Sequence, residues 1–188
     1  MRLKASIFSC VLALILASQA SGANINILHT FTSGATDGRA PTGLLLDGSV
    51  LYGTTSLGGL YNSGTVYNIN TNGTGFSLLH TFTGVTGGYS PRANLTLDGT
   101  TLYGTTGGFG GTVYKLQSNG TGFSTLHQFP FPGTPTSPEG PNNGVAIIGS
   151  TLYGVTTDGG VNANQVGNGG TIFSLGTDGT GFSLMHEF

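Results

Sequence analysis

Histidine is the side chain best suited to acid–base or metal chemistry in this sequence, and it occurs four times, as His29, His80, His127 and His186. Each histidine follows Leu or Met and stands two residues before Phe. A metal site needs donor nitrogens that converge at about 2 Å from one ion. Because every histidine occupies the same position of a different repeat, we expect the four rings to lie far apart. We therefore predict no metal site and assign the imidazoles a structural role, packed and hydrogen-bonded between aromatic rings.

The carboxylates are few and regularly placed. Every aspartate is followed by glycine, namely Asp37, Asp47, Asp98, Asp158 and Asp178. An Asp-Gly pair is typical of a tight turn, in which glycine supplies the positive φ and the carboxylate binds local backbone. A glycoside hydrolase would have to take its two carboxylates from turns, because Glu139 and Glu187 are the only glutamates. No spacing matches a calcium loop, so we predict no cofactor and leave open only weak calcium binding at loop aspartates.

Other signatures of catalysis are also missing from the sequence. No Gly-x-Ser-x-Gly elbow occurs, and the glycine pairs lack the lysine and the strand–turn–helix context of a phosphate-binding loop. We predict that the protein is not an enzyme. A secreted carbohydrate-active enzyme on a propeller scaffold is the alternative function.

The composition indicates which elements position these residues. Glycine supplies 35 of the 188 residues, and charged residues make up 6% of the chain, where about 25% is usual. With 37% hydrophobic residues and a formal net charge of -2, the chain can bury a core, which a disordered chain cannot. Helical bundles are excluded because glycine costs about 1 kcal/mol at each helical position. The composition favours an all-β protein with many tight turns.

The first 23 residues are typical of a secretory signal peptide, because a basic start (Met1–Lys4) precedes an apolar run (Ile7–Leu16) and small residues (Ala17–Ala23). We predict a signal peptide over 1–23 and a secreted, periplasmic or extracellular mature chain. That chain has no transmembrane segment, since a membrane span takes about 20 apolar residues. It contains three basic and seven acidic residues. Nucleic acid is therefore not an expected partner, because it binds clustered Lys and Arg.

The mature chain, 24–188, is predicted to be a single domain built from an internal repeat. Three blocks recur in the same order: Leu-Tyr-Gly from Leu51, Leu102 and Leu152, Gly-Thr-Val or Gly-Thr-Ile from Gly64, Gly111 and Gly170, and Gly-Thr-Gly-Phe ending at Phe76, Phe123 and Phe182. A period of about 50 residues indicates a propeller, a solenoid or an array. The predicted units are an extra strand over 24–31 and repeats over 32–82, 83–129 and 130–188.

Each repeat is predicted to form four short strands, with hairpin turns of the Asp-Gly or Gly-Ser type. Strand four alternates, which predicts Phe76, Leu78, His80 and Phe82 on one face of the sheet. We interpret the recurring aromatic residues and histidines as structural positions of the repeat: Tyr52, Tyr103, Tyr153, Phe76, Phe123, Phe182, His80, His127 and His186.

Together these blocks resemble the GloVer-type tandem repeats of secreted bacterial choice-of-anchor proteins. The pattern is Leu-Tyr-Gly-Thr-Thr, Gly-Gly, Gly-Thr-Val-Tyr, Asp/Asn-Gly-Thr-Gly-Phe-Ser and Leu-His-x-Phe, and it covers residues 27–188. The glycine pair and the aromatic residue of strand four are also similar to kelch-like β-propeller blades. The resemblance implies export and a propeller-like repeat, and it implies no catalytic residues.

Three repeats are fewer than the four to eight blades of a closed propeller. The predicted fold is therefore all-β and propeller-like, with the array open, fragmentary or completed by oligomerisation, such as a dimer with six blades. Because open sheet edges can pair with other chains, self-association is an expected partner interaction. A β-trefoil is the alternative fold, since it also has three four-stranded units.

Short turns and long connections alternate along each repeat, so the long ones should share one edge of the sheets. Binding residues concentrate in such loops. The loop residues predicted to bind a ligand are Tyr61, Tyr89, Arg92, Phe109, Asn162 and Asn164. Aromatic rings beside amides suit neutral polar ligands such as glycans. We predict a secreted, non-catalytic binding or structural module whose partner is a glycan or a surface protein.

Overall fold

The computed structural model describes residues 25–84, 87–108, 110–130, 140–157, 159 and 169–188. These residues form twelve strands and no helix, so none of them belongs to a helix that could cross a membrane. The strands make three separate four-stranded antiparallel sheets. This confirms the predicted all-β, propeller-like fold. The β-trefoil alternative is wrong, because each described strand pairs only within its own repeat.

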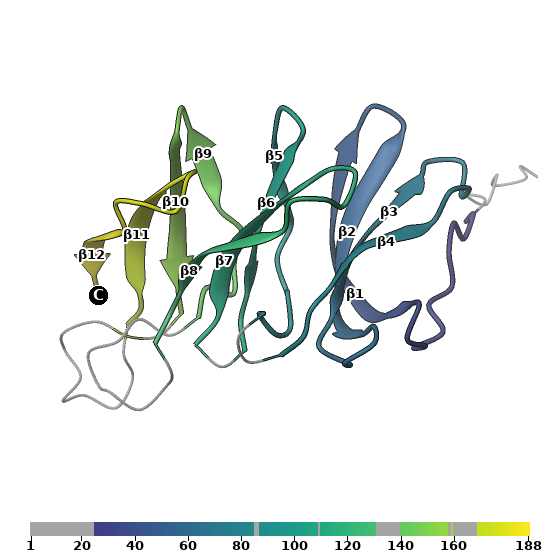
Figure 1. Cartoon of the computed structure of the whole chain (residues 1–188), viewed down its shortest axis with the longest axis horizontal. Coiled ribbons are helices and arrows are strands. Elements are labelled where there is room, and N and C mark those ends of the chain that lie inside the picture. Colours follow the sequence, from purple (N-terminus) through teal and green to yellow (C-terminus); the bar gives the residue numbers. More distant parts are fainter. Residues whose placement is uncertain (1–24, 85–86, 109, 131–139, 158, 160–168) are drawn as a thin grey trace, which may run out of the picture.

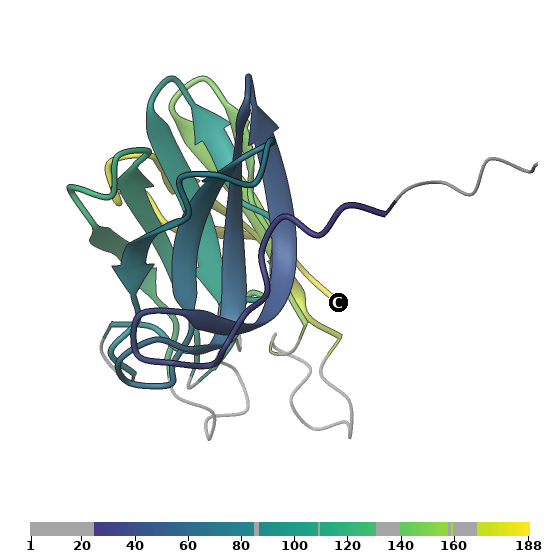
Figure 2. The ribbon, with the colours of Figure 1, turned by 90° about the vertical axis from the view of Figure 1, so that its right-hand side faces the viewer.

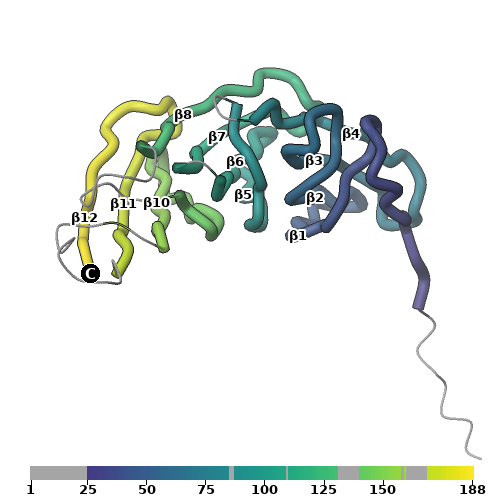
Figure 3. The backbone as a smooth tube through the Cα atoms, turned by 90° about the horizontal axis from the view of Figure 1, so that it is seen from below, coloured from purple at the N-terminus to yellow at the C-terminus, as the bar shows by residue number. Residues whose placement is uncertain are grey.

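Each sheet is a meander whose strands follow in sequence order. The first contains β1 (Gly38–Asp47), β2 (Val50–Gly58), β3 (Thr65–Asn70) and β4 (Ser77–Thr81). The second contains β5 (Thr96–Asp98), β6 (Thr101–Thr106), β7 (Thr112–Gln117) and β8 (Ser124–Gln128). The third contains β9 (Ala146–Ile148), β10 (Thr151–Thr156), β11 (Thr171–Gly176) and β12 (Ser183–Glu187). The three sheets stand side by side along an open arc (Figures 1 and 3).

Tight turns lie together at one edge of the array, and the longer connections lie at the opposite edge (Figure 1). Asp47 pairs with Val50, so β1 and β2 are joined by two residues, and the first of them, Gly48, has a φ of 55°. The turn between β11 and β12 is closed by Asp178, whose Oδ1 accepts hydrogen bonds from the backbone N and Oγ1 of Thr180 at 2.9 and 2.8 Å. The predicted turn role of Asp178 is therefore confirmed.

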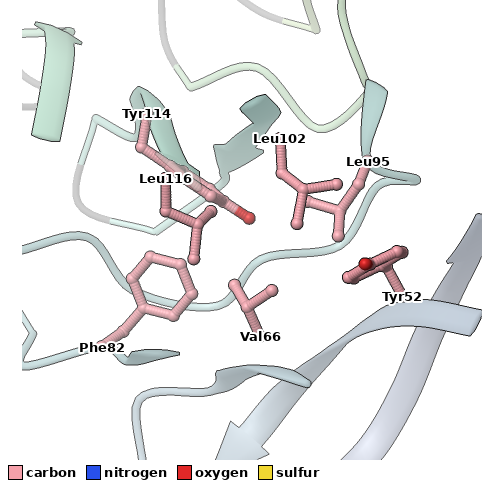
Figure 4. Close-up of a cluster of buried hydrophobic side chains, with 7 residues drawn as sticks. All are labelled: Tyr52, Val66, Phe82, Leu95, Leu102, Tyr114 and Leu116. Carbon is pink, nitrogen blue, oxygen red and sulfur yellow. The ribbon is translucent and has the colours of Figure 1, made fainter. Parts of the chain in front are cut away.

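Neighbouring sheets pack against each other through two apolar clusters. The first, between the first and second sheets, is drawn in Figure 4 and contains Tyr52, Val66, Phe82, Leu95, Leu102, Tyr114 and Leu116. The second contains the equivalent residues of the next pair of sheets: Tyr103, Val113, Phe129, Val145, Leu152, Phe173 and Leu175. Burying one such side chain contributes about 1.5–3 kcal/mol. The contacts between sheets therefore supply the hydrophobic core.

A histidine from strand four of one repeat stacks on a phenylalanine of the next repeat. His80 lies 3.6 Å from Phe123 between ring centroids, at an interplanar angle of 8°. His127 lies 3.8 Å from Phe182, at 5°. Two residues further on, Phe82 meets the ring of Tyr114 edge-on at 5.1 Å. Both histidines therefore pack on aromatic rings, as predicted. The predicted hydrogen bond is missing at His80, whose Nε2 is buried and has no hydrogen-bond partner among the described residues.

The predicted alternation along strand four is wrong. Phe76 contacts His29 on one side of the first sheet, whereas His80 contacts Phe123 of the second sheet. The register between β3 and β4 shifts at this point, so that Leu79 is the extra residue of a β-bulge. A bulge of one residue reverses the face to which the following side chains point. Because β8 and β12 show the same shift, the bulge is a feature of the repeat.

Residues 25–31, which the sequence predicts as an extra strand, form no strand. They cross the outer face of the first sheet (Figure 2) and contact it through side chains. His29 stacks on Phe76 at 3.8 Å, and Phe31 meets Tyr67 edge-on at 5.2 Å. The segment thus takes the place that strand four of a preceding repeat would have. It forms no strand because none of the described strands lies beside its backbone to pair with it.

We expect Tyr114→Phe to raise the free energy of unfolding by about 1 kcal/mol in urea denaturation, because an unpaired buried hydroxyl costs about 1–3 kcal/mol. Tyr114 is completely buried, and its Oη makes no hydrogen bond within the described residues. The equivalent residue of the third sheet is Phe173, also completely buried. Tyr61→Phe, at an exposed ring, is the control. A loss of stability in Tyr114→Phe would show that the hydroxyl has a partner.

We expect His80 to titrate near pH 4, because burial lowers its pKa to about 4. Burial also lowers the pKa of His127. From about pH 6.5 downward the unfolded chain binds protons that the folded chain does not. Stability is therefore complete above that pH and falls as the pH approaches 4. The titration midpoint of His80 is measured by NMR from its imidazole Cε1 resonance. A midpoint near pH 6.5 would contradict the prediction.

Candidate functional site

The long-loop edge is the edge of the array opposite the tight turns, and it comprises residues 58–64, 87–92, 107–108, 110–111 and 140–143. Backbone hydrogen bonds join these loops to one another. Ser90 N donates to the Ser63 carbonyl at 2.9 Å, which links the first two sheets. Gly107 N donates to the Ser90 carbonyl at 3.2 Å, and Gly108 N donates to the Tyr89 carbonyl at 3.0 Å. The loops therefore form one continuous surface across the first two sheets.

Two residues of this edge hold backbone conformations that are unusual outside glycine. Ser90 is buried and has a φ of 56°, and Asn62 has a φ of 52°. The surroundings hold both in place: Gly58 N donates to Asn62 Oδ1 at 3.1 Å, and Ser90 Oγ accepts a hydrogen bond from Arg92 Nε at 3.1 Å. Left-handed backbone persists at such residues only where neighbouring contacts enforce it. The edge is therefore preorganised.

Tyr89, Arg92 and Asn142 converge on the glycine pair Gly107–Gly108. A Cβ at Gly108 would overlap the ring of Tyr89, and a Cβ at Gly107 would overlap Asn142 Oδ1 and lie 3.9 Å from Arg92 Cδ. Arg92 is exposed, Tyr89 is half-buried, and Asn142 Nδ2 donates to Thr157 Oγ1 at 3.0 Å. The absence of side chains on the two glycines leaves the room that these three groups occupy. The result is a ring, a guanidinium and an amide in one place.

Tyr61 lies on the neighbouring loop and presents its ring to solvent. It is 56% exposed, and the preceding Leu60 is 64% exposed. The carbonyl of Tyr61 accepts a hydrogen bond from Ser63 Oγ at 3.2 Å, which ties the loop to the residue that joins it to Ser90. An aromatic ring is thus displayed beside a fixed backbone.

The structure brings together two of the six predicted ligand-binding residues, Tyr89 and Arg92, and places Tyr61 on the adjoining loop. Phe109, Asn162 and Asn164 lie outside the described residues. Sequence reasoning missed Asn142. Its signal was the Pro-Asn pair at Pro141, which occupies the repeat position of Pro91 before Arg92.

Asp37 also belongs to this edge, because its carbonyl accepts a hydrogen bond from Gly59 N at 2.7 Å. The sequence predicts an Asp-Gly turn here, but Gly38 is the first residue of β1 and has no positive φ, so the role of Asp37 is different. Its carboxylate accepts hydrogen bonds from the backbone N and Oγ1 of Thr32 at 2.7 and 2.8 Å and contacts His29 Nε2 at 3.2 Å. Asp37 therefore clamps residues 29–32 onto the first sheet.

The carboxylate of Asp37 is committed to this clamp. Burial alone would raise its pKa, but the hydrogen bonds from Thr32, His29 and Gly38 hold the pKa below its usual value. Stabilisation by Asp37 is thus present above the ordinary pKa of an aspartate and is lost only as the pH falls through the lower folded value. Among the described residues, no group of three or more His, Cys, Asp or Glu side chains could hold a metal ion.

Comparisons with known proteins agree with this architecture. A family model described as the Gloeobacter/Verrucomicrobia repeat matches residues 13–188. No curated protein matches the chain. The chain is similar to a crystal structure of a nidogen/laminin complex, with a TM-score of 0.52 and 18% identity. The match covers 81% of this chain and 49% of the solved chain. The match to the structure of a putative TolB from Agrobacterium tumefaciens covers 86% of this chain and 52% of the solved chain, with a TM-score of 0.49 and 12% identity.

The chain spans about half the length of these two solved structures. At 18% identity, the likeness to the nidogen/laminin complex concerns the fold alone, which is that of a β-propeller.

We expect Asp37→Ala to release residues 29–32 from the first sheet while leaving the three sheets folded. Amide hydrogen exchange of Thr32 should become about tenfold faster, because its backbone N–H loses the carboxylate that accepts its hydrogen bond. Asp47→Ala removes an exposed turn carboxylate and is the matched control. Unchanged exchange in Asp37→Ala would mean that the ring contacts of His29 and Phe31 hold the segment by themselves.

Proposed function

As the chain belongs to the Gloeobacter/Verrucomicrobia repeat family, we propose that it is an exported, non-catalytic binding module that takes a neutral glycan on its long-loop edge. The observation that carries the proposal is the convergence of Tyr89, Arg92 and Asn142, with the exposed ring of Tyr61 on the adjoining loop. Export rests on the basic and apolar character of residues 1–23.

The chemistry of this edge suits a sugar. A pyranose offers a CH face to an aromatic ring and hydroxyl groups to nearby donors and acceptors. Tyr61 and Tyr89 supply the rings, and Arg92 and Asn142 supply donors. A guanidinium has five N–H donors, of which the one at Nε is held by Ser90 Oγ. The remaining donors are those of an exposed side chain.

The scaffold beneath the loops favours binding because it is rigid. At the base of the β2–β3 connection, and of the equivalent β6–β7 connection, two buried threonine hydroxyls pair across the strands. Thr55 Oγ1 lies 2.8 Å from Thr65 Oγ1, and Thr106 Oγ1 lies 2.9 Å from Thr112 Oγ1. These pairs fix the strand ends from which the loops start. A preorganised site loses less conformational freedom when a ligand binds.

Asp37 supports a non-catalytic role. Its carboxylate lies at this edge and already accepts hydrogen bonds from Thr32 and from Gly38 N at 2.7 Å. A general base needs a free lone pair within reach of the substrate proton. The lone pairs of Asp37 face the polypeptide instead, which suits a clamp.

We expect Tyr61→Ala to weaken glycan binding about tenfold, since an aromatic contact contributes roughly 0.5–1.5 kcal/mol beyond the buried area and 1.4 kcal/mol is a factor of ten. A glycan array identifies the ligand, and titration calorimetry with that ligand measures the loss. Ile148→Ala is the matched control, because Ile148 is 72% exposed and ends β9 at the tight turn before β10, away from the long loops.

Three outcomes would count against the proposal. Equal binding by wild type and Tyr61→Ala would remove this loop from the site. Equal loss in Ile148→Ala would place binding elsewhere on the array. Release of sugar products from a polysaccharide by the purified protein would favour the alternative, a carbohydrate-active enzyme.

A further inference from the structure

Each sheet carries a seat for the tetrapeptide Leu-His-x-Phe that precedes its repeat. The seat of the second sheet consists of Gly120, Phe123 and Tyr114. Leu79–Phe82 occupies it: the Leu79 carbonyl oxygen lies 3.0 Å from the place of a Cβ on Gly120, His80 stacks on Phe123, and Phe82 meets Tyr114. Because Gly120 has no Cβ, the backbone segments at Leu79 and Gly120 can approach each other this closely.

The first and third sheets have the same seat. On the third sheet, Leu126–Phe129 lies against Gly179, Phe182 and Phe173, with Leu126 O at 3.1 Å from the Gly179 Cβ position and Phe129 at 5.3 Å from Phe173. On the first sheet, Leu28–Phe31 lies against Gly73, Phe76 and Tyr67, with Leu28 O at 3.3 Å from the Gly73 Cβ position. In the part of the chain that the structure describes, three seats are thus occupied by three tetrapeptides.

A fourth tetrapeptide, Met185–Phe188, has no seat among the described residues. Met185 and Phe188 are each 57% exposed, whereas Phe82 and Phe129 are 0% and 1% exposed. Its shape is nevertheless that of the occupied ones. His186 meets Phe188 edge-on at 4.5 Å and 77°, and His80 meets Phe82 at 4.9 Å and 83°. The tetrapeptide is therefore already folded for a seat.

The opposite end of the array exposes the complementary surface. Leu44 and Leu46 of β1 are 56% and 60% exposed, although Leu95, the equivalent of Leu44 in the second sheet, is only 4% exposed. A groove of about 490 Å³ lies between Leu44 and the tetrapeptide Leu28–Phe31 that occupies the first sheet's seat, lined in part by Leu28, Leu44, Leu51 and Tyr67. In the interior interface, Tyr52 lies beside Leu95, the equivalent of Leu44 (Figure 4). Its equivalent at the far end, Tyr153, is only half-buried.

We propose that the third sheet of one copy of this chain binds the first sheet of a second copy, and that Met185–Phe188 competes there with the resident Leu28–Phe31 for the seat of Gly73, Phe76 and Tyr67. The interaction continues the pattern of the two interfaces inside the molecule. It is head-to-tail, because the two surfaces are different, and such contacts add copies until the assembly closes.

Two features make this contact weaker than the interfaces inside the chain. The resident tetrapeptide must leave the seat, and Asp37 clamps it there. In the interior, Thr54 Oγ1 donates to the Ala93 carbonyl at 3.2 Å and Thr105 Oγ1 to the Asn143 carbonyl at 2.9 Å. Val155 stands at the equivalent position of the third sheet and has no hydroxyl. The clamped segment Leu28–Phe31 and the missing hydroxyl at Val155 therefore both weaken association.

Analytical ultracentrifugation of two blocked variants tests the proposal. Met185→Asp places a charge on the third-sheet surface, and Leu44→Asp places one on the first-sheet surface. We expect wild type to associate with rising concentration and each variant alone to stay monomeric. An equimolar mixture should form a one-to-one dimer and nothing larger, because it retains one intact pair of surfaces. Failure of the mixture to dimerise, or wild type that stays monomeric at its solubility limit, would overturn the proposal.

Asp37→Ala tests the competition. Loosening the resident tetrapeptide should strengthen association about tenfold, because a larger fraction of seats is open. Adding Met185→Asp to Asp37→Ala should return the protein to monomers. Leu60→Ala, at an exposed leucine outside both surfaces, is the control and should associate as wild type does. Association of the Asp37→Ala, Met185→Asp double variant would show a contact other than this one. None of these outcomes depends on glycan binding.

Discussion

The stack of a histidine on a phenylalanine of the next repeat is the contact on which the rest of this structure depends. It recurs at His29–Phe76, His80–Phe123 and His127–Phe182, with centroid distances of 3.8, 3.6 and 3.8 Å. Aromatic pairs of this kind contribute about 0.5–1.5 kcal/mol beyond the area they bury. The stack also fixes the distance and tilt between sheets, because the neighbouring Phe of strand four must then meet the ring in strand three. Repetition of one contact thus gives the arc of Figure 3.

The β-bulge in strand four makes this contact possible. Without the extra residue at Leu79, Phe76 and His80 would point to the same face, and one repeat could not both receive a histidine and donate one. With the bulge, Phe76 faces the preceding unit and His80 faces the following one. Sequence alternation alone could not reveal the bulge, because an alternating apolar pattern looks the same in either register.

Periodicity, by contrast, was sufficient to predict the strands and their order. The blocks at Leu51, Leu102 and Leu152 lie on β2, β6 and β10, and those at Gly64, Gly111 and Gly170 precede β3, β7 and β11. The exception was residues 25–31, whose sequence is that of a strand but which lack a neighbouring strand. At the site, the position of Tyr61 on an exposed loop followed from the sequence. The gathering of Tyr89, Arg92 and Asn142 did not, because it depends on how Gly107 and Gly108 pass between two connections far apart in the chain.

The low charge of the chain follows from the same architecture. The second sheet lies between two others, so both of its faces are buried, and Leu102, Val113, Tyr114 and Leu116 are completely enclosed. A charge on either face would lose its hydration without gaining a partner. Lys115, on β7, donates a hydrogen bond from Nζ to the Thr177 carbonyl of the next repeat at 2.9 Å. Apart from Lys115, the charged side chains of the described residues therefore lie at or near strand ends or in turns and loops, as Asp47, Asp98 and Arg92 do. A partner can therefore contact an array of this kind only along an edge or across an end that no sheet covers, where the groups available are mainly hydroxyls, amides and aromatic rings.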